Sequence, residues 1–207
     1  TLLTTITRHD INNQLTVLKG YLELLAPLQA DQKLVGYCTK AEEAAERIAA
    51  MIRFTREYEE IGTSVPLWHD ARALVDAALS QAPVGDVLVR NDIFAGMEIF
   101  ADPLVEKVLY NLMDNAVRYG TTITTIRFSA TDTDGTLMLV CEDDGTGVLP
   151  EEKERIFERG FGKNTGLGLA LSREILDITG IMIRENGEPG KGARFEMMVP
   201  PGAWRAR

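Results

Sequence analysis

Apolar residues in the first part of the chain recur at alternating spacings of three and four, the pattern of helices that pack side by side. The first run comprises Ile11, Leu15, Leu18, Leu22 and Leu25, and the second comprises Leu34, Ala41, Ala45, Ile48, Ile52 and Thr55. Pro27 and the polar letters that follow it separate the two runs, because proline cannot continue a helix. The pattern predicts a helical hairpin.

Two helices of this length cannot enclose a core alone, so the apolar face of the hairpin needs a partner. We expect a second copy of the chain to supply it, which gives a dimeric four-helix bundle with two-fold symmetry. The stretch EIGTSVPLW then breaks the repeat with glycine and proline. The hairpin is therefore expected to span residues 1–61, and a second domain to span residues 62–207.

Beyond that break, helical and strand patterns alternate along the chain. Helices are predicted at about 70–81, 103–119 and 166–179, and strands at about 87–93, 97–100, 122–131, 135–142, 181–186 and 192–199. Helices mixed with hairpins are typical of an α+β fold in which the helices cover one face of a mixed sheet. The predicted fold class is therefore α+β, a helical hairpin followed by an α/β sandwich.

The composition of the 207 residues narrows the possible partners and the cellular compartment. A formal net charge of −9 disfavours nucleic acid and anionic membrane surfaces, because both are bound through lysine and arginine. The sequence has no membrane-length apolar run, and Cys38 and Cys141 match no metal or redox spacing. We therefore expect a cytoplasmic protein with two buried thiols. Because Thr1 opens within a helical pattern and is not Met, we also expect a fragment of a longer protein, with room for an upstream sensor or membrane anchor.

Three segments of the second domain carry residues suited to a nucleotide. In NLMDNAVRYG, Asn111 and Asn115 are four residues apart and so share one helix face. Amide oxygens are suitable ligands for Mg²⁺, and Arg118 and Tyr119, one turn further on, can reach phosphate oxygens. Taken alone, paired asparagines on a helix are more often a solvated surface.

The other two segments are rich in glycine. In CEDDGTGV a strand runs into Asp143, whose carboxylate can accept a hydrogen bond from an exocyclic amine, while Gly145 and Gly147 allow a tight turn. An ordinary acidic turn is the alternative. In GKNTGLGLAL the start of a predicted helix offers backbone N–H groups and a dipole to an anion. The residues concerned are Thr165, Gly166, Leu167 and Gly168.

The order of these segments, with IFERGF between the last two, resembles the ATP-binding domain shared by histidine kinases, gyrase, Hsp90-type chaperones and MutL. The resemblance implies that ATP and Mg²⁺ bind here, with Asn115 holding the metal and Asn111 beside it. It also implies that Asp143 reads the adenine amino group and that Gly145 and Gly147 line the pocket.

The same resemblance assigns the third segment to a lid over the nucleotide. Gly166 and Gly168 would hinge this lid and bring backbone amides to the phosphates. Only the letters GKN separate ERGF from TGLGL, whereas the family usually has a longer lid with a basic residue that binds phosphate. Lys163 is the candidate for that role, and Arg159 is the reserve.

The segment RHDINNQL resembles the phosphoacceptor box of sensor histidine kinases, in which a histidine is followed by an acid and, after two further positions, by threonine or asparagine. With the leucines on the apolar face, His9 and Asn13 are predicted on the outer side of the helix. The resemblance implies that His9 accepts the γ-phosphoryl group, that Asp10 orients the imidazole and takes its proton, and that Asn13 positions a water for a phosphatase reaction. Gln14 stands where the family often has proline, so the usual kink is not expected. On this segment alone, an exposed histidine without a task is the alternative.

Together these resemblances cover nearly the whole chain and imply a histidine kinase core. It would phosphorylate itself on His9 within a homodimer formed through residues 1–61, and pass the phosphoryl group to the receiver domain of a response regulator. We expect no nucleic-acid partner and no membrane contact by these residues. Three alternatives stay open: an ATPase or a Ser/Thr kinase of the anti-sigma type on the same nucleotide fold, a dimeric adaptor without kinase activity, and a protein that acts mainly as a phosphatase.

Overall fold

The computed structural model describes residues 2–25, 32–162 and 166–207, with the backbone alone for residues 2–10, 24, 32 and 33. The chain divides into two compact units, Thr1–Glu59 and Glu60–Arg207. Within the described part of the chain, no helix is both long enough and apolar enough to cross a membrane.

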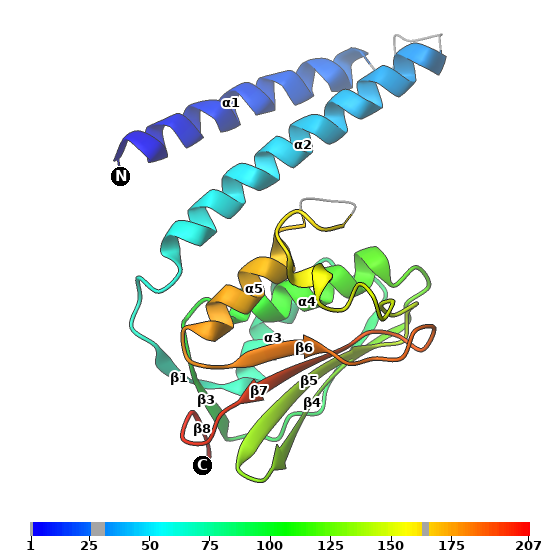
Figure 1. The fold of residues 1–207 in the computed structure, drawn as a ribbon. Coiled ribbons are helices and arrows are strands. Elements are labelled where there is room, and N and C mark those ends of the chain that lie inside the picture. Colours follow the sequence, from blue (N-terminus) through cyan, green and yellow to red (C-terminus); the bar gives the residue numbers. More distant parts are fainter. Residues whose placement is uncertain (1, 26–31, 163–165) are drawn as a thin grey trace. The chain divides into compact units, whose positions relative to one another are not determined.

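The first unit contains the two predicted helices, α1 (Leu2–Leu25) and α2 (Gln32–Glu60) (Figure 1). They meet where Leu15 packs against Ala45 and Ala49. Beside this contact, the ammonium group of Lys19 donates a hydrogen bond to the carboxylate of Glu46. The hairpin pattern of the sequence is therefore present, although the apolar contact between its helices is small.

The apolar run of α1 divides into two columns and does not form a single buried face. Leu15 and Leu22 are 7% and 8% exposed, whereas Ile11, Leu18 and Leu25 are 39%, 45% and 46% exposed. Spacings of three and four generate two adjacent columns, each with a seven-residue repeat, and one neighbouring helix covers only one of them. The second column stays exposed in a single copy of the chain.

The second unit is built on a mixed, five-stranded sheet. The strands, in their order across the sheet, are β2 (Leu88–Asn91), β4 (Thr125–Thr133), β5 (Thr136–Asp143), β7 (Arg194–Val199) and β6 (Met182–Glu185). β2 runs parallel to β4, and the remaining neighbours are antiparallel. Three helices cover one face, α3 (Ala71–Gln81), α4 (Val105–Tyr119) and α5 (Gly168–Asp177) (Figure 1). This arrangement confirms the predicted α+β sandwich.

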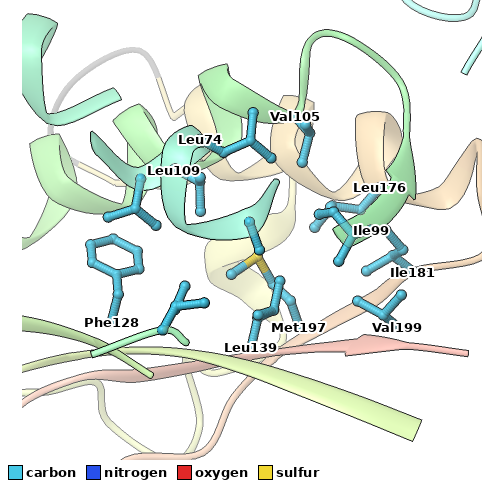
Figure 2. Close-up of a pocket in the computed structure, with 13 residues that line it drawn as sticks. Leu74, Ile99, Val105, Leu109, Phe128, Leu139, Leu176, Ile181, Met197 and Val199 are labelled. Atoms are coloured by element: carbon cyan, nitrogen blue, oxygen red, sulfur yellow. The ribbon is translucent and has the colours of Figure 1, made fainter. Parts of the chain in front are cut away.

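The core lies between these helices and the sheet (Figure 2). A cavity of about 10 Å³ remains there, lined by apolar side chains that include Leu74, Leu109, Phe128, Leu139 and Met197. That volume is about the space that one water molecule needs, and the apolar lining offers a water no hydrogen bond. The cavity is a packing gap in the core, and a nucleotide must bind elsewhere.

A second, three-stranded antiparallel sheet differs from the sequence prediction. Its order is β1 (Leu67–Asp70), β3 (Met97–Ala101) and β8 (Trp204–Ala206), of which only β3 was predicted. The ring of Trp68 packs on Phe100 with 5.4 Å between centroids, and the guanidinium of Arg205 lies 4.1 Å from the Trp68 ring. β1 and β8 are too short to show an alternating pattern, so their pairing depends on contacts distant in sequence.

Candidate nucleotide-binding site

Asp143 ends β5 with one carboxylate oxygen fixed and the other available. Its Oδ1 accepts hydrogen bonds from the backbone N–H groups of Gly145, at 2.9 Å, and Ala193, at 3.1 Å. Its Oδ2 receives no hydrogen bond from any described residue. Burial raises the pKa of Asp143, while the two backbone hydrogen bonds act in the opposite direction. The free oxygen is therefore a hydrogen-bond acceptor held in a defined position.

Asp144, the next residue, has a different environment. Its carboxylate accepts hydrogen bonds from the backbone N–H groups of Thr124, at 2.8 Å, and Thr125, at 3.0 Å, and from the Thr124 hydroxyl. The hydrogen bond from the Thr124 hydroxyl is the main cause that lowers the pKa of Asp144 to about 2. Asp144 therefore holds the start of β4, and of the two neighbouring acids only Asp143 has an oxygen that accepts no hydrogen bond from a described residue.

The two glycines of this segment serve close backbone packing. A Cβ atom on Gly145 would lie 2.6 Å from Cα of Gly120, at the end of α4. Gly147 has φ +71°, and a Cβ atom there would lie 2.8 Å from the carbonyl oxygen of Gly192. Any side chain at either position would force the backbone apart. The glycines thus bring the end of β5 against both α4 and the loop between β6 and β7.

The asparagines of α4 differ in their hydrogen bonding. Nδ2 of Asn111 donates to the carbonyl oxygen of Gly168, at 3.1 Å, and to Oγ of Ser172, at 3.2 Å, so that Asn111 joins α4 to the start of α5. Nδ2 of Asn115 is buried and has no hydrogen-bond partner in the described structure. An unpaired buried amide costs free energy until a ligand or water completes it. Asn115 is therefore suited to contact a ligand.

Arg118 and Tyr119 follow one turn later at the surface. Nε of Arg118 lies 2.7 Å from both carboxylate oxygens of Asp114, an ion pair that raises the pKa of the guanidinium. Tyr119 is 41% exposed, and its carbonyl oxygen accepts a hydrogen bond from the Thr146 hydroxyl at 3.3 Å. Asp114 therefore engages Nε of Arg118, while the Nη groups carry the remaining donors of the guanidinium.

The short lid closes on itself through its glycines. The N–H of Gly160 donates to the carbonyl oxygen of Gly166 at 3.0 Å. Gly160 and Gly166 both have positive φ, and a Cβ atom on Gly166 would lie 2.4 Å from the carbonyl oxygen of Phe161. Only glycine fits such a conformation without strain. Gly168 then begins α5, with Leu167 at its N-terminal cap.

The lid residues predicted to bind phosphate are placed only in part. Lys163 and Thr165 lie outside the described residues. Arg159, the reserve, directs Nη2 to the carboxylate of Glu174 on α5 at 2.6 Å. The guanidinium of Arg159 therefore anchors the lid to α5 in this structure.

Comparisons with known proteins agree with this geometry. Residues 101–203 match the family described as histidine kinase-, DNA gyrase B- and HSP90-like ATPase. The chain is 28% identical to the signal transduction histidine-protein kinase AtoS of Escherichia coli K12, over 93% of this chain and 33% of that protein. It is 32% identical to the sensor protein RstB of the same organism, over 93% of this chain and 47% of that protein. Residues 101–203 belong to this ATPase family, and the chain is similar to sensor histidine kinases over nearly its whole length.

The chain spans less than half the length of these two relatives. Among solved structures, full-length ShkA in complex with AMPPNP matches with a TM-score of 0.69 and 22% identity, over 99% of this chain and 46% of that chain. At that identity the match shows the common fold.

The second unit brings several of the predicted residues together. The hydrogen bonds of Asn111 join α4 to α5, while Thr146 joins the CEDDGTGV segment both to the end of α4 and, through its carbonyl oxygen, to the N–H of Gly190. His9 and Asp10 belong to α1 in the other unit, and their side chains lie outside the described part. Asn13 is exposed.

The sequence did not predict the contact between Asp143 and the loop that joins β6 to β7. Ala193 contributes only a backbone N–H, which leaves no trace in a sequence. Lys153 and Glu185 form an ion pair next to the same loop, with 2.8 Å between Nζ and Oε2. The glycine-rich letters NGEPGKG were the one available sign that this loop approaches another part of the backbone.

Proposed function

We propose that this kinase binds Mg-ATP in residues 62–207, transfers the γ-phosphoryl group to His9, and passes it to an aspartate in the receiver domain of a response regulator. One observation carries the proposal: a single chain contains both the ATPase-family region and, in α1, the RHDINNQL segment. An ATPase or anti-sigma-type kinase on the same nucleotide fold would lack the helical hairpin and its histidine.

Recognition of adenine is assigned to the free oxygen of Asp143. Because Gly145 and Ala193 hold Oδ1, Oδ2 is the atom that accepts a hydrogen bond from the exocyclic amine. A carboxylate acceptor makes a stronger hydrogen bond than a neutral one. This contact distinguishes adenine from a purine that lacks the amine.

The asparagines of α4 fit a Mg²⁺ ion bound together with phosphates. Mg²⁺ usually takes one or two protein ligands and completes its coordination with water and phosphate oxygens. The described residues include no group of three or more His, Cys, Asp or Glu able to hold a metal, so the nucleotide itself must supply ligands. Asn115 would hold the ion through its amide oxygen, while its buried and unpaired Nδ2 would donate to a phosphate oxygen or a water. Asn111 would keep α5 in place beside it. The ion would neutralise charge on the phosphates during transfer.

Phosphorylation of His9 requires a neutral imidazole nitrogen as the nucleophile. As the new N–P bond forms, the bond between the γ-phosphorus and the β–γ bridging oxygen breaks, and ADP leaves. The carboxylate of Asp10 would orient the ring and take the proton that imidazole loses. The receiver aspartate would then accept the phosphoryl group from the phosphohistidine.

The proposed homodimer is supported by apolar side chains that the hairpin leaves exposed. Within the described side chains of the first unit, only those of Leu15, Leu22, Ala45 and Ala49 are buried. The second column of α1 is exposed, and α2 also has exposed apolar residues. Among them are Leu34, Ile48 and Met51, which are 50%, 45% and 53% exposed. A second copy would bury both sets in a four-helix bundle. The two-fold symmetry would give one dimer two His9 residues.

The decisive experiment uses γ-labelled ATP with Mg²⁺ on three proteins: the parent chain, His9→Gln and His69→Gln. His69 is a matched control, because it is the other histidine of the chain and its Nε2 lies 3.2 Å from the carbonyl oxygen of Ala101. We expect acid-labile, alkali-stable label on the parent chain and on His69→Gln, and none on His9→Gln. Label that survives His9→Gln, or ATP binding without any labelling, would contradict the kinase proposal. If ATP binds without any labelling, dephosphorylation of a phosphorylated receiver domain would favour the alternative that the protein acts mainly as a phosphatase.

A further inference from the structure

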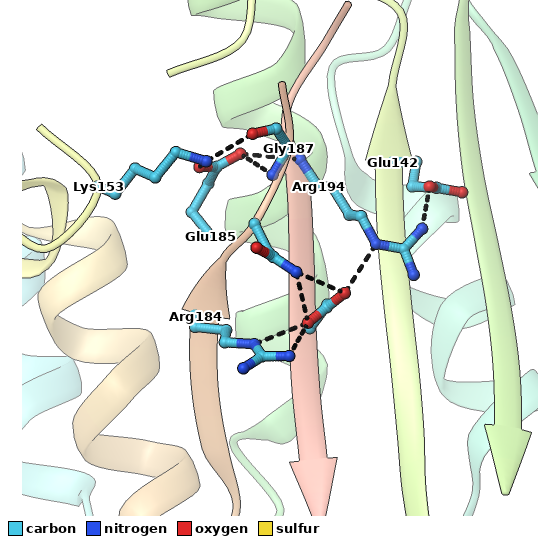
Figure 3. A network of polar contacts seen from close by, with 8 residues as sticks. Glu142, Lys153, Arg184, Glu185, Gly187 and Arg194 are labelled. Atoms are coloured by element: carbon cyan, nitrogen blue, oxygen red, sulfur yellow. Dashed lines mark hydrogen bonds and ion pairs between the residues drawn. The ribbon is translucent and has the colours of Figure 1, made fainter. Parts of the chain in front are cut away.

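Glu185, the last residue of β6, has a fully buried carboxylate that pairs with Lys153 (Figure 3). The exposed fraction of its side chain is 0%. Its Oε1 accepts hydrogen bonds from the backbone N–H groups of Gly187, at 2.9 Å, and Arg194, at 3.1 Å. These two residues stand near the two ends of the loop between β6 and β7. One buried carboxylate therefore holds both ends of this loop.

Lys153 supplies the charge that this carboxylate needs. Its Nζ lies 2.8 Å from Oε2 of Glu185 and donates to the carbonyl oxygen of Gly187 at 2.5 Å. Lys153 lies a few residues beyond the CEDDGTGV segment, so the pair connects the segment after β5 with the segment after β6. A buried ion pair that loses one member leaves an uncompensated charge, which strongly disfavours the native geometry.

The loop held in this way contacts Asp143 directly. The N–H of Ala193 donates to Oδ1 of Asp143 at 3.1 Å, and the N–H of Asp143 donates to the carbonyl oxygen of Ala193 at 3.0 Å. A Cβ atom on Gly192 would lie only 1.8 Å from the carbonyl oxygen of Asp143. Because the two backbones are this close, a small movement of the loop changes the position of the Asp143 carboxylate.

We propose that Lys153 and Glu185 are a positioning pair for adenine recognition, an inference that rests on the proposed role of Asp143. The pair fixes the β6–β7 loop, the loop supplies one of the two hydrogen bonds that hold Oδ1, and the held carboxylate directs Oδ2 to the amine. Under the proposed function, the triphosphate and its Mg²⁺ are held by another element, α4. Loss of the pair therefore lowers selectivity for the amine more than it lowers affinity for the triphosphate.

The neighbouring ion pairs in Figure 3 do not hold the β6–β7 loop in the same way. Arg194 pairs with Glu142 and Glu196, and its side chain is 36% exposed. Arg184 pairs with Glu196 and is 49% exposed. The two arginine side chains face solvent, where water screens them, although the carboxylate of Glu196 is only 5% exposed. The Lys153–Glu185 pair differs because Glu185 accepts hydrogen bonds from backbone N–H groups near both ends of the loop that contacts Asp143.

The test compares the affinity of the kinase for ATP with that for purine riboside triphosphate, which has the same triphosphate but no amine. Lys153→Met removes the charge, and Lys153→Arg keeps it. Lys191→Met is the matched control, because Lys191 lies in the same loop and pairs with Glu188 at 2.6 Å, but both side chains are exposed. Thermal unfolding of every variant is measured in parallel.

We expect the parent chain to prefer ATP by about tenfold or more, since one hydrogen bond to a charged group distinguishes the ligands. Lys153→Met should lose most of this preference while still binding both nucleotides. Lys153→Arg should regain part of it, and Lys191→Met should keep it in full. The double variant Lys153→Met with Glu185→Gln has no unpaired buried charge. It therefore tests the connection between the segment after β5 and the segment after β6 even where the single variant unfolds. Its preference for ATP should also fall.

An unchanged preference in a folded Lys153→Met or double variant would overturn the positioning role while leaving ATP binding intact. A parent chain that binds both nucleotides equally would overturn the role of Asp143, and the positioning role with it. A loss of preference in Lys191→Met equal to that in Lys153→Met would show that any change in the loop has this effect, which also overturns the specific role of the pair.

Discussion

Replacing Asp143 and Asp144 separately with asparagine is expected to give opposite results, although the two residues are adjacent and chemically identical. In Asp143→Asn, the N–H groups of Gly145 and Ala193 continue to require an acceptor, so the amide oxygen takes the place of Oδ1. The amide nitrogen then takes the place of Oδ2 and faces the adenine amine, donor against donor. The loss of a charge-assisted hydrogen bond costs about 2 kcal/mol, or about 30-fold in the Kd for ATP.

Stability should respond in the other direction. Burial raises the pKa of Asp143, which means that its ionised form destabilises the fold above the ordinary carboxyl pKa. Asp143→Asn removes that charge and keeps both backbone hydrogen bonds, so the midpoint of thermal unfolding at neutral pH should stay equal or rise. A variant that binds ATP as well as the parent chain, or that unfolds at a much lower temperature, would refute this account of the site.

Asp144→Asn is expected to keep ATP binding and lose stability. Its pKa is lowered from 3.8 to about 2, so the ionised carboxylate stabilises the fold above the ordinary pKa, and that contribution disappears as the pH falls toward 2. The lowered pKa corresponds to about 2.5 kcal/mol, and screening of this exposed group reduces the effect to about 1 kcal/mol, or roughly 3 °C in Tm. The difference from the parent chain should shrink between pH 4 and pH 2, as measured by unfolding at each pH. A constant difference across that range would contradict the assignment.

Three further changes test other parts of the structure. Gly145→Ala should lower the free energy of unfolding in urea by about 2–3 kcal/mol, because its Cβ atom would lie 2.6 Å from Cα of Gly120; an unchanged midpoint would contradict the close packing. Ile48→Glu, at an exposed apolar position of α2, should convert the dimer to a monomer in sedimentation equilibrium, and a persistent dimer would exclude this position from the interface. A thiol reagent at about pH 8 should modify Cys38, which is half-buried, and not Cys141, because burial raises the pKa of the Cys141 thiol; equal rates in the folded protein would contradict its burial.

Much of the fold could be predicted because the responsible patterns are local. The seven-residue repeat predicted both helices of the hairpin, and the alternation of helical and strand patterns predicted the five strands of the main sheet, although not their order. The helix expected to begin at about residue 70 begins at Ala71, because Oδ1 of Asp70 accepts a hydrogen bond from the N–H of Ala73 at 2.8 Å. The strands β1 and β8 escaped prediction, since three or four residues carry too little pattern. Of the two cysteines expected to be buried, Cys38 is only partly covered.

The sequence by itself determined the order of the helices and strands, the presence of Asn115, Asp143 and the lid glycines, and the resemblance that these residues carry. The tertiary structure alone decided which of two adjacent acids has an oxygen free for a ligand, which apolar column of α1 is buried, and that Lys153 meets Glu185. Secondary structure follows from periodicity that neighbouring residues share. Hydrogen bonding, burial and charge pairing depend instead on which distant segments the fold brings within about 3 Å of one another.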